Sequence, residues 1–476
     1  MKTISIAYRN IFRNKRRSIM TIIAISVSAI ALLLFGGFVS SIMKNIETGI
    51  IMSTGHLHIY KKGYTDFGAG NTANYGIDNY QEIIKIIKNS NELKQYIKVT
   101  TNFLFFGGIA GNYKVGASNI FSGLGIEPKA LKEMNAWNDY NVRLTKSGLN
   151  FQIDDNDVNN GLIGYGLAKM LRLTELLDER DVIKEEAEPD STANSKSATT
   201  SSETFDFSGL LEAVGTDKPE ETSKKYITKI DLLASTAEGG APNVINLYLN
   251  KAAKFPQKVH NDNFIIANIE LAQNLIYGHS EKKVTAIVLQ LKKTNDLNKV
   301  KQIIIDKLKP TKFFENIEIK SFNEIRPEYN QTINMFVIIF SFVAIIMIMI
   351  IIVVLSNTMS MSVMERYNEI GTLRALGLRR IRILKQFVAE GLLLGLIGSI
   401  FGIIISIVIA YIVNTSEITW IPPSYANELL LSIHIFIIPW FLPVITIGII
   451  AISGIASVIP AYKAAEMNIV DALRHN

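Results

Sequence analysis

Few residues of this chain have the side-chain types and spacing that catalysis or metal binding requires. His56 and His58 alternate in Gly-His-Leu-His-Ile, so both would point to the same side of a strand, as two ligands of one metal ion must. No acidic residue or third histidine stands near them in the sequence, which favours structural histidines over a metal site. The chain has no cysteine, and this excludes disulfides, thiolate catalysis and cysteine-ligated metal centres.

Motifs for catalysis and nucleotide binding are absent from the sequence. It contains no GxSxG, no HExxH and no GxxxxGK[ST], and Gly371 and Gly377 do not form a phosphate-binding loop. We therefore expect no catalytic residue, no cofactor and no enzymatic activity in this chain. If ATP powers the protein, a second chain must bind it.

The apolar residues of the chain gather in four long runs. Of its 476 residues 48% are hydrophobic. A helix rises 1.5 Å per residue, so ~20 apolar residues cross the ~30 Å hydrocarbon core of a membrane. The runs predict transmembrane helices at 19–42, 333–355, 387–413 and 435–459. The first run is too long for a typical signal peptide and no clear cleavage site follows it, so we expect it to be retained.

The distribution of charge predicts how these helices are oriented. Residues 1–18 carry six Lys or Arg and no acid, the 356–386 loop carries six Lys or Arg against two Glu, and the 414–434 loop has no Lys or Arg. Because cytoplasmic flanks are rich in Lys and Arg, this predicts that the 356–386 loop and both termini, including the tail 460–476, are cytoplasmic and that 43–332 lies outside. The net charge of +6 therefore reflects the orientation of the helices in the membrane, and we expect no nucleic-acid partner.

The long segment 43–332 mixes the periodicities of strands and helices, which predicts an α+β domain. Within it, Val99–Phe106 and Tyr113–Phe121 flank a Gly-Asn pair at Gly111-Asn112, which predicts a hairpin turn. An acidic run followed by a Ser/Thr/Asn/Ala tract predicts a disordered insertion at 184–225. The predicted fold class is a membrane α-helical protein with four transmembrane helices and a large α+β extracytoplasmic domain.

Residues 363–377 have the pattern of a short amphipathic helix between the second and third apolar runs. Arg366 is placed to pair with Glu369 or in the neighbourhood of Glu365, and Gly377 stands where the end of a helix favours a residue tolerant of positive φ. Such a helix would lie against the membrane and offer apolar side chains to a cytoplasmic partner. The alternative is an interfacial helix that binds nothing. The residues that keep helical spacing are Val363, Tyr367, Ile370 and Leu373/Leu376, with Glu365, Arg366, Glu369 and Arg374 as their polar complement.

Small residues in the third apolar run predict where helices approach closely. Gly391 and Gly395 are four residues apart, and so are Gly398 and Gly402, which places all four on roughly one helix face. Glycine is common in membrane helices, but two GxxxG spacings in tandem favour a helix-packing seam.

Several motifs occur along the chain in a fixed order. They are Glu365-Arg366, Glu369-Ile370-Gly371, Leu373-Arg374-Ala375 and Gly377 in the loop, Glu390 in the third run, Pro460-Ala461, Ala464-Ala465 and Ala472-Leu473-Arg474 in the tail, Ala7-Tyr8-Arg9-Asn10-Ile11 with Arg13 to Arg17 at the start, and Gly55-His56-Leu57 and Leu271-Ala272-Gln273 in the domain. Together these motifs resemble a known family, the FtsX-like ABC permeases, which includes lipoprotein-releasing permeases and the MacB macrolide-exporter type. Ile469 departs from the pattern, because the family's ending usually has proline there, which would alter the turn of the tail.

The resemblance implies a mechanism and a set of partners. Two permeases, identical or paralogous, would pair in the cytoplasmic (inner) membrane, in contact with membrane lipid, on a dimer of ABC ATP-binding subunits. The 363–377 helix would be the coupling helix, and ATP-driven closure would move it. The first and second spans would carry the movement to the external domain, which is mechanotransmission. The implied coupling residues are Glu365, Arg366, Glu369, Ile370, Gly371, Leu373, Arg374, Ala375 and Gly377.

Three functions are compatible with this resemblance. The first is release of a lipoprotein or another hydrophobic cargo from the outer leaflet of the cytoplasmic membrane to a periplasmic acceptor, which Gly55-His56-Leu57-His58-Ile59 and the absence of a fused ATPase favour. The second is a non-transporting regulator that activates cell-wall hydrolases, and the third is MacB-like peptide or antibiotic efflux. A sensor or an enzyme is disfavoured because no catalytic constellation is visible.

Overall fold

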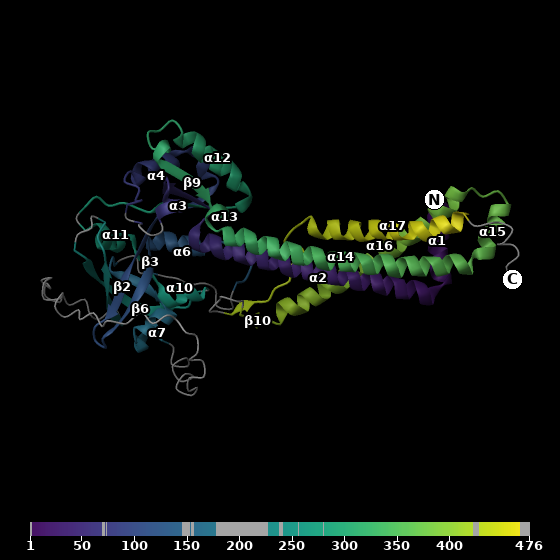
Figure 1. The fold of residues 1–476 in the computed structure, drawn as a ribbon, viewed down its shortest axis with the longest axis horizontal. Helices are drawn as coiled ribbons and strands as arrows, with labels where there is room; N and C mark the ends of the chain where they lie inside the picture. Colours follow the sequence, from purple (N-terminus) through teal and green to yellow (C-terminus); the bar gives the residue numbers. More distant parts are fainter. Residues whose placement is uncertain are drawn as a thin grey trace.

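The protein consists of a bundle of long helices joined to a mixed sheet domain (Figure 1). The computed structural model describes residues 2–68, 72, 74–144, 153, 157–177, 227–237, 241–255, 257–278, 280–421 and 428–466. The predicted disordered insertion at 184–225 and the tail from residue 467, which includes Ile469 and Ala472-Leu473-Arg474, lie outside the described residues.

Four helices are long and apolar enough to cross a membrane, which together with the sheet domain confirms the predicted fold class. Two of them are much longer than a single crossing requires, with 40 residues in α2 and 39 in α14. At 1.5 Å per residue each measures about 60 Å, twice the ~30 Å hydrocarbon core. We call α2 and α14 the stalk helices. The helices of the bundle are α1 (Lys2–Arg13), α2 (Lys15–Thr54), α14 (Pro327–Glu365), α15 (Tyr367–Ala375), α16 (Arg380–Thr415) and α17 (Phe441–Glu466).

The helix of the fourth span begins at Phe441, six residues later than the expected start at 435. Pro443 then stands in the first turn, where a helix needs no backbone N–H from it. Before this helix, β10 (Thr419–Trp420) and β11 (Leu429–Leu430) form a two-stranded hairpin. Arg143 of the sheet domain lies 3.2 Å from Glu417 beside that hairpin, so this end of α16 adjoins the domain.

The domain is built on a nine-stranded sheet in the order β3-β7-β4-β6-β5-β2-β8-β1-β9. β3 also pairs with β2, so six of the strands close into a ring. The 16-residue strand β2 joins the ring to the other three strands, because Ile97–Phe103 pair with β8 and Leu104–Asn112 pair with β3. The strands are β1 (Leu57–Lys61), β2 (Ile97–Asn112), β3 (Ala117–Ile126), β4 (Asn160–Gly164), β5 (Thr228–Ala234), β6 (Asn243–Ala253), β7 (Phe264–Asn268), β8 (Ala286–Leu291) and β9 (Ile317–Ser321).

Short helices cover this sheet and complete its core. In α12 the residues Val300, Ile304 and Leu308 are buried on one face, which is the spacing that the sequence predicts. The helices of the domain are α3 (Tyr64–Phe67), α4 (Tyr80–Asn89), α5 (Asn91–Lys94), α6 (Pro128–Asn135), α7 (Tyr165–Met170), α10 (Lys258–Asn263), α11 (Ile269–Tyr277), α12 (Leu297–Leu308) and α13 (Phe322–Ile325).

The predicted hairpin exists, but its turn lies elsewhere. Gly111 and Asn112 are part of β2 and pair with β3, and the turn falls at residues 113–116. Gly116 has a φ of 63°, which glycine adopts without steric cost. Asn112 is held in the strand because its side-chain amide donates a 3.0 Å hydrogen bond to the carbonyl oxygen of Leu171.

Both stalk helices enter the domain at the same place. α2 ends at Thr54 and continues through Gly55 into β1, and β9 leads through α13 into the start of α14. β1 and β9 are paired antiparallel neighbours, from Leu57 opposite Ser321 to Lys61 opposite Ile317. The two helices are therefore joined through hydrogen-bonded strands.

Candidate functional site

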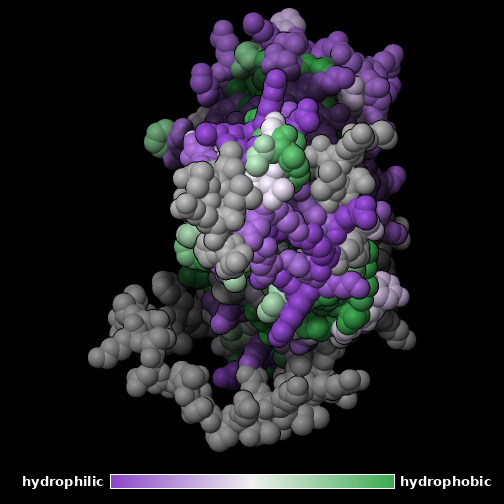
Figure 2. Space-filling view, turned by 90° about the vertical axis from the view of Figure 1, so that its right-hand side faces the viewer, coloured by the Kyte–Doolittle hydropathy of each residue, from purple (hydrophilic) through white to green (hydrophobic). Residues whose placement is uncertain are grey.

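The candidate site is the short helix α15, which lies at the end of the bundle farthest from the sheet domain (Figure 1). The N-terminus and α1 lie at the same end. Figure 2 looks onto this end and shows a mainly hydrophilic surface with small hydrophobic patches. The structure thus gathers at one end the segments whose positive charge predicts a cytoplasmic location.

The helix predicted over 363–377 is divided in two. Val363 to Glu365 continue the stalk helix α14, Arg366 leaves helical geometry with φ −104° and ψ 18°, and α15 starts at Tyr367. The break reorients the chain, so α15 is a separate element and not an extension of the second span. The apolar spacing of the sequence does not reveal this break, because it continues across Arg366.

The end of α15 is a Schellman motif. The Leu378 N–H donates to the Leu373 carbonyl oxygen, and the Gly377 N–H donates to the Arg374 carbonyl oxygen, both at 3.0 Å. Gly377 has a φ of 88°, and a Cβ there would be strained by the backbone alone. This glycine ends the helix before the chain enters α16.

Arg366 forms a buried ion pair with Glu390 of α16. Its two terminal nitrogens lie 3.2 and 3.4 Å from the two carboxylate oxygens, and both residues are 4% exposed. The predicted pairing of Arg366 with Glu369 is therefore wrong. A buried carboxylate without a counter-charge is costly, so the guanidinium is directed inward to Glu390 and away from its exposed neighbour.

The two glutamates beside Arg366 contact the N-terminal helices. Glu365 accepts hydrogen bonds of 2.5 Å from Arg17 and 2.7 Å from Asn14, and Glu369 lies 2.9 Å from Arg13. Each exposed pair contributes little alone, typically about 0.2–1 kcal/mol. Together they connect the start of α2 and the end of α1 to the end of α14 and the first turn of α15. In the sequence these basic residues indicate topology and contribute to the family resemblance, but they do not predict this contact.

The inner and outer faces of α15 differ. Ile370 and Gly371 face the bundle and are buried, and the Arg374 guanidinium donates to the Ala465 carbonyl oxygen in the last turn of α17. Leu373 and Leu376, on the other side, are 41% and 80% exposed. Of the predicted coupling residues, Ala375 is exposed as well. The inner residues fix α15 to the bundle, and the outer residues leave an apolar surface uncovered.

The four glycines of α16 lie at close helix contacts, but with two different partners. A Cβ on Gly391 or Gly395 would come within 2.7 Å of Ser457 or Ser453 of α17. A Cβ on Gly398 would meet Ile25 of α2, and one on Gly402 would meet Ala29, also of α2, at 2.4 Å. The seam is therefore shared along its length by the first and fourth spans.

The two histidines singled out by their spacing are buried, His56 just before β1 and His58 within it. His56 Nδ1 accepts a 3.0 Å hydrogen bond from the Leu291 N–H, and His58 Nδ1 lies 3.0 Å from the Tyr60 hydroxyl. Burial lowers the pKa of each to about 3. Within the described ranges there is no cluster of three or more His, Cys, Asp or Glu side chains that could hold a metal ion. Both histidines serve as neutral packing and hydrogen-bonding residues.

Comparison with known proteins shows that part of the chain is similar to a known family. Residues 341–469, from the second span to the tail, match the FtsX-like permease C-terminal family. The chain is 28% identical over 218 residues, 45% of its length, to an ABC transporter permease of Methanocaldococcus jannaschii. It is 34% identical over 123 residues, 25% of its length, to the ABC transporter permease YtrF of Bacillus subtilis. It is 27% identical over 197 residues, 40% of its length, to the macrolide export ATP-binding/permease protein MacB of Neisseria meningitidis.

These matches confirm the resemblance to the FtsX-like ABC permeases. They cover part of each relative, namely 51% of the length of the archaeal permease and 28% of the length of YtrF and of MacB. The matched family region contains α15, the Arg366–Glu390 ion pair and the glycine seam.

Proposed function

We propose that this FtsX-like permease chain is the membrane subunit of an ABC transporter and works by mechanotransmission. A separate ATP-binding subunit binds α15 in the cytoplasm, and its ATP-driven closure displaces that helix. The stalk helices carry the displacement through the membrane to the sheet domain outside. In this arrangement 1–18, 356–386 and the tail are cytoplasmic, and 43–332 is extracytoplasmic.

The observation that carries the proposal is the continuity of the stalk helices between α15 and the sheet. α14 runs without a break from Pro327, next to the domain, to Glu365, one residue before α15. α2 contacts the same site at its start through Arg17 and enters β1 at its end. An unbroken helix of about 60 Å transmits a displacement along its axis, because its backbone hydrogen bonds resist compression.

The attachment of α15 supports its role as the moving part. Ion pairs and hydrogen bonds link α15, or the two residues before it, to α1, α2, α16 and α17. A push on α15 therefore reaches α2, α16 and α17 through these contacts, and it reaches α14 through the backbone at Arg366. The exposed side chains of Leu373 and Leu376 form the apolar contact that a groove of the ATP-binding subunit would cover.

The cargo that we propose is a lipoprotein or another lipid-like molecule released from the outer leaflet. Each CH₂ transferred from lipid to water costs about 0.8 kcal/mol, so whole acyl chains cost roughly tens of kcal/mol. Such a step needs work from ATP and an acceptor that takes the lipid directly. Mislocalised lipoproteins on depletion of the chain support this cargo, whereas a captured cell-wall hydrolase with normal lipoproteins supports the regulatory alternative.

The coupling role is tested with the exposed face of α15. A tagged chain is purified from membranes with its ATP-binding subunit, and ATP turnover is measured in lipid nanodiscs. Leu376→Asp places a charge in the proposed contact, and we expect it to abolish both copurification and turnover. Val259→Asp is the matched control, because Val259 is equally an exposed apolar residue but lies in α10 of the sheet domain. Unchanged turnover in Leu376→Asp would remove the coupling role.

The orientation is tested separately with single cysteines, since the chain has none of its own. A membrane-impermeant maleimide should label Val259→Cys in intact spheroplasts and should label Leu376→Cys only after lysis. Labelling of both positions before lysis would place α15 and the sheet domain on the same side and would end the proposal.

A further inference from the structure

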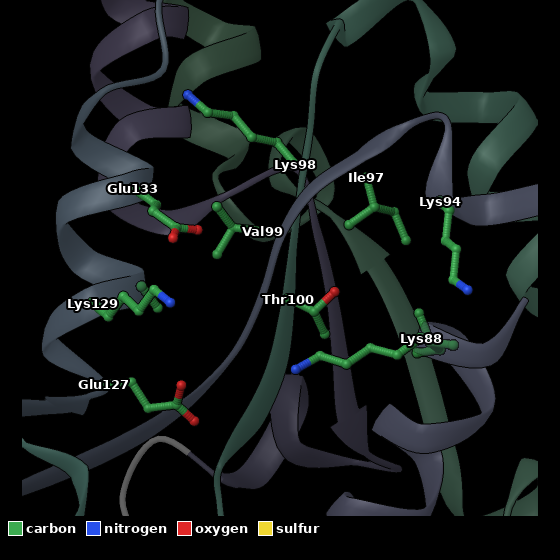
Figure 3. A pocket seen from close by; sticks show the side chains of 11 residues that line it. Lys88, Lys94, Ile97, Lys98, Val99, Thr100, Glu127, Lys129 and Glu133 are labelled. Atoms are coloured by element: carbon green, nitrogen blue, oxygen red, sulfur yellow. The ribbon is translucent and has the colours of Figure 1, made fainter. Parts of the chain in front are cut away.

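A groove of about 460 Å³ runs along the first half of β2 in the sheet domain (Figure 3). Its floor is Ile97 to Thr100 of that strand. α6 forms one wall, and α4 and α5 form the other. In Figure 3 Glu127, Lys129 and Glu133 extend from their helix toward the strand, and Lys88 reaches across from the opposite side toward Thr100.

The floor of this groove is an unpaired strand edge. Among the described strands, Ile97–Phe103 pair only with β8, whereas Ile109–Gly111 pair with β3 on one side and with β5 on the other. The Phe103 carbonyl oxygen and the Phe105 N–H both bond to Thr285, next to β8, so the odd-numbered residues direct their backbone groups toward β8. Successive residues of a strand alternate, so the N–H and C=O of Thr100 point away from β8, into the groove.

The groove carries an excess of positive charge. Four lysines and two glutamates line it. The wall made by α4 and α5 has only Lys88 and Lys94 as charged groups, whereas Lys129 on the α6 wall stands between the two glutamates. None of the four lysines forms an ion pair within 4.0 Å in the part of the chain that the structure describes. Burial lowers the pKa of Lys98 more than the nearby Glu133 carboxylate raises it, and a further carboxylate would favour the charged form of Lys98.

An open strand edge and lysines without ion pairs would recognise two different features of one ligand. Backbone N–H and C=O groups at an edge bind another extended backbone, as in β-strand addition. The lysines of one wall would meet every second side chain of that added strand, because side chains alternate between its two faces. Acidic residues at alternate positions satisfy both features.

We propose that this groove binds an extended, acidic segment of a partner protein by strand addition to the free edge of β2, with alternate carboxylates facing Lys88 and Lys94. The site lies in the domain that we place outside the membrane. Binding of a segment in this groove is separate from the proposed coupling function, because strand addition requires only the groove and neither α15 nor ATP.

The test uses the full-length chain in detergent micelles and a fluorescein-labelled peptide of alternating Glu and Val, about eight residues long like an ordinary strand. Fluorescence anisotropy should show saturable binding. A peptide of alternating Lys and Val should bind at least about tenfold more weakly. The Glu–Val peptide with a central proline should lose binding, because proline cannot donate to a strand edge.

Two charge reversals on neighbouring helices locate the site. Lys94→Glu changes the α5 wall and should weaken binding of the Glu–Val peptide about tenfold. Lys85→Glu is the matched control, because Lys85 is an exposed lysine of α4 that does not line the groove, and it should leave binding unchanged. Equal losses in both variants would mean general charge attraction and would overturn the proposal. So would equal binding of the proline peptide, or no binding up to millimolar concentration.

A disulfide readout checks the position directly. Because the chain has no cysteine, Thr100→Cys introduces a single thiol on the floor of the groove. A Glu–Val peptide whose central cysteine is carried as a disulfide with 5-thio-2-nitrobenzoate should exchange with the Thr100→Cys thiol, releasing thionitrobenzoate, far faster than with Lys85→Cys. Equal rates at the two positions would contradict strand addition at β2.

Discussion

The Tyr140 hydroxyl donates a 2.6 Å hydrogen bond to the carboxylate of Glu47. Glu47 belongs to α2, is 4% exposed, and also lies 2.8 Å from Lys44. The Tyr329 hydroxyl of α14 donates to the same carboxylate at 3.4 Å. Tyr140 follows α6 in the sheet domain, so one buried carboxylate joins both stalk helices to the domain they enter.

Removal of the Tyr140 hydroxyl should loosen this junction. Tyr140→Phe deletes a hydrogen bond to a charged acceptor, and we expect the free energy of unfolding to fall by about 1.5–3 kcal/mol. Trp137 is buried close to Tyr140, with ring centroids 5.9 Å apart, so its fluorescence during urea unfolding reports the change. Tyr411→Phe is the control, because Tyr411 is exposed, and an equal loss in both variants would contradict the role of the junction.

Disruption of the buried Arg366–Glu390 pair should cost more than disruption of an exposed pair. Glu390→Gln leaves the guanidinium of Arg366 buried without a counter-charge, and we expect a loss of about 3–5 kcal/mol in unfolding free energy. Glu369→Gln breaks the exposed pair with Arg13 and should cost less than about 1 kcal/mol. Urea unfolding of the two variants in detergent measures the difference.

The double variant Arg366→Met with Glu390→Leu provides the check on that interpretation. Replacement of both charges by apolar groups of similar size leaves no uncompensated charge. The double variant should therefore be more stable than Arg366→Met alone or Glu390→Leu alone. If the two single losses simply add, the pair is not energetically coupled and the prediction fails.

Much of the fold could be predicted because it depends on local patterns. Long apolar runs identify the four membrane helices, and the spacing of Val300, Ile304 and Leu308 identifies α12. The hairpin of β2 and β3 was also predictable, but its turn was misplaced because Gly111-Asn112 has the composition of a turn while Asn112 is held by Leu171, far along the chain. Local signals fail where a distant partner decides the conformation.

The candidate site was predictable as a segment but not as an arrangement. The helical period of 363–377 continues across Arg366, so the break there is invisible in the sequence. The partner of Arg366 is 24 residues away in another helix, and the partner of Glu369 is Arg13, 356 residues away. No rule of local spacing links residues so far apart, and only the packing of α1, α14 and α16 brings them together.

The glycine seam predicts opposite effects for two glycine substitutions. Gly402→Ala brings a methyl group within 2.4 Å of Ala29, so α16 and α2 must separate, and we expect a loss of about 1–3 kcal/mol. Gly448→Ala in α17 has no described atom within 4 Å of the added methyl and should be neutral or stabilising by up to about 1 kcal/mol. Thermal unfolding in detergent distinguishes them, and equal melting temperatures would refute close packing at Gly402.

The buried histidines predict that the sheet domain loses stability in acid. Burial lowers the pKa of His56 and His58 in the folded state to about 3, whereas an unfolded histidine titrates near 6.5. Protons therefore bind preferentially to the unfolded chain. Stability is complete above about pH 6.5 and falls toward pH 3, by up to about 1.4 kcal/mol per pH unit for each histidine.

Urea unfolding followed through Trp137 between about pH 6.5 and 5 measures this slope before most carboxylates titrate. His56→Asn removes one titrating group and keeps an oxygen that can accept the hydrogen bond from the Leu291 N–H, so it should reduce the slope by up to about 1.4 kcal/mol per pH unit. A stability that does not change over this interval, or a slope that His56→Asn leaves unaltered, would mean that His56 is not held neutral by burial.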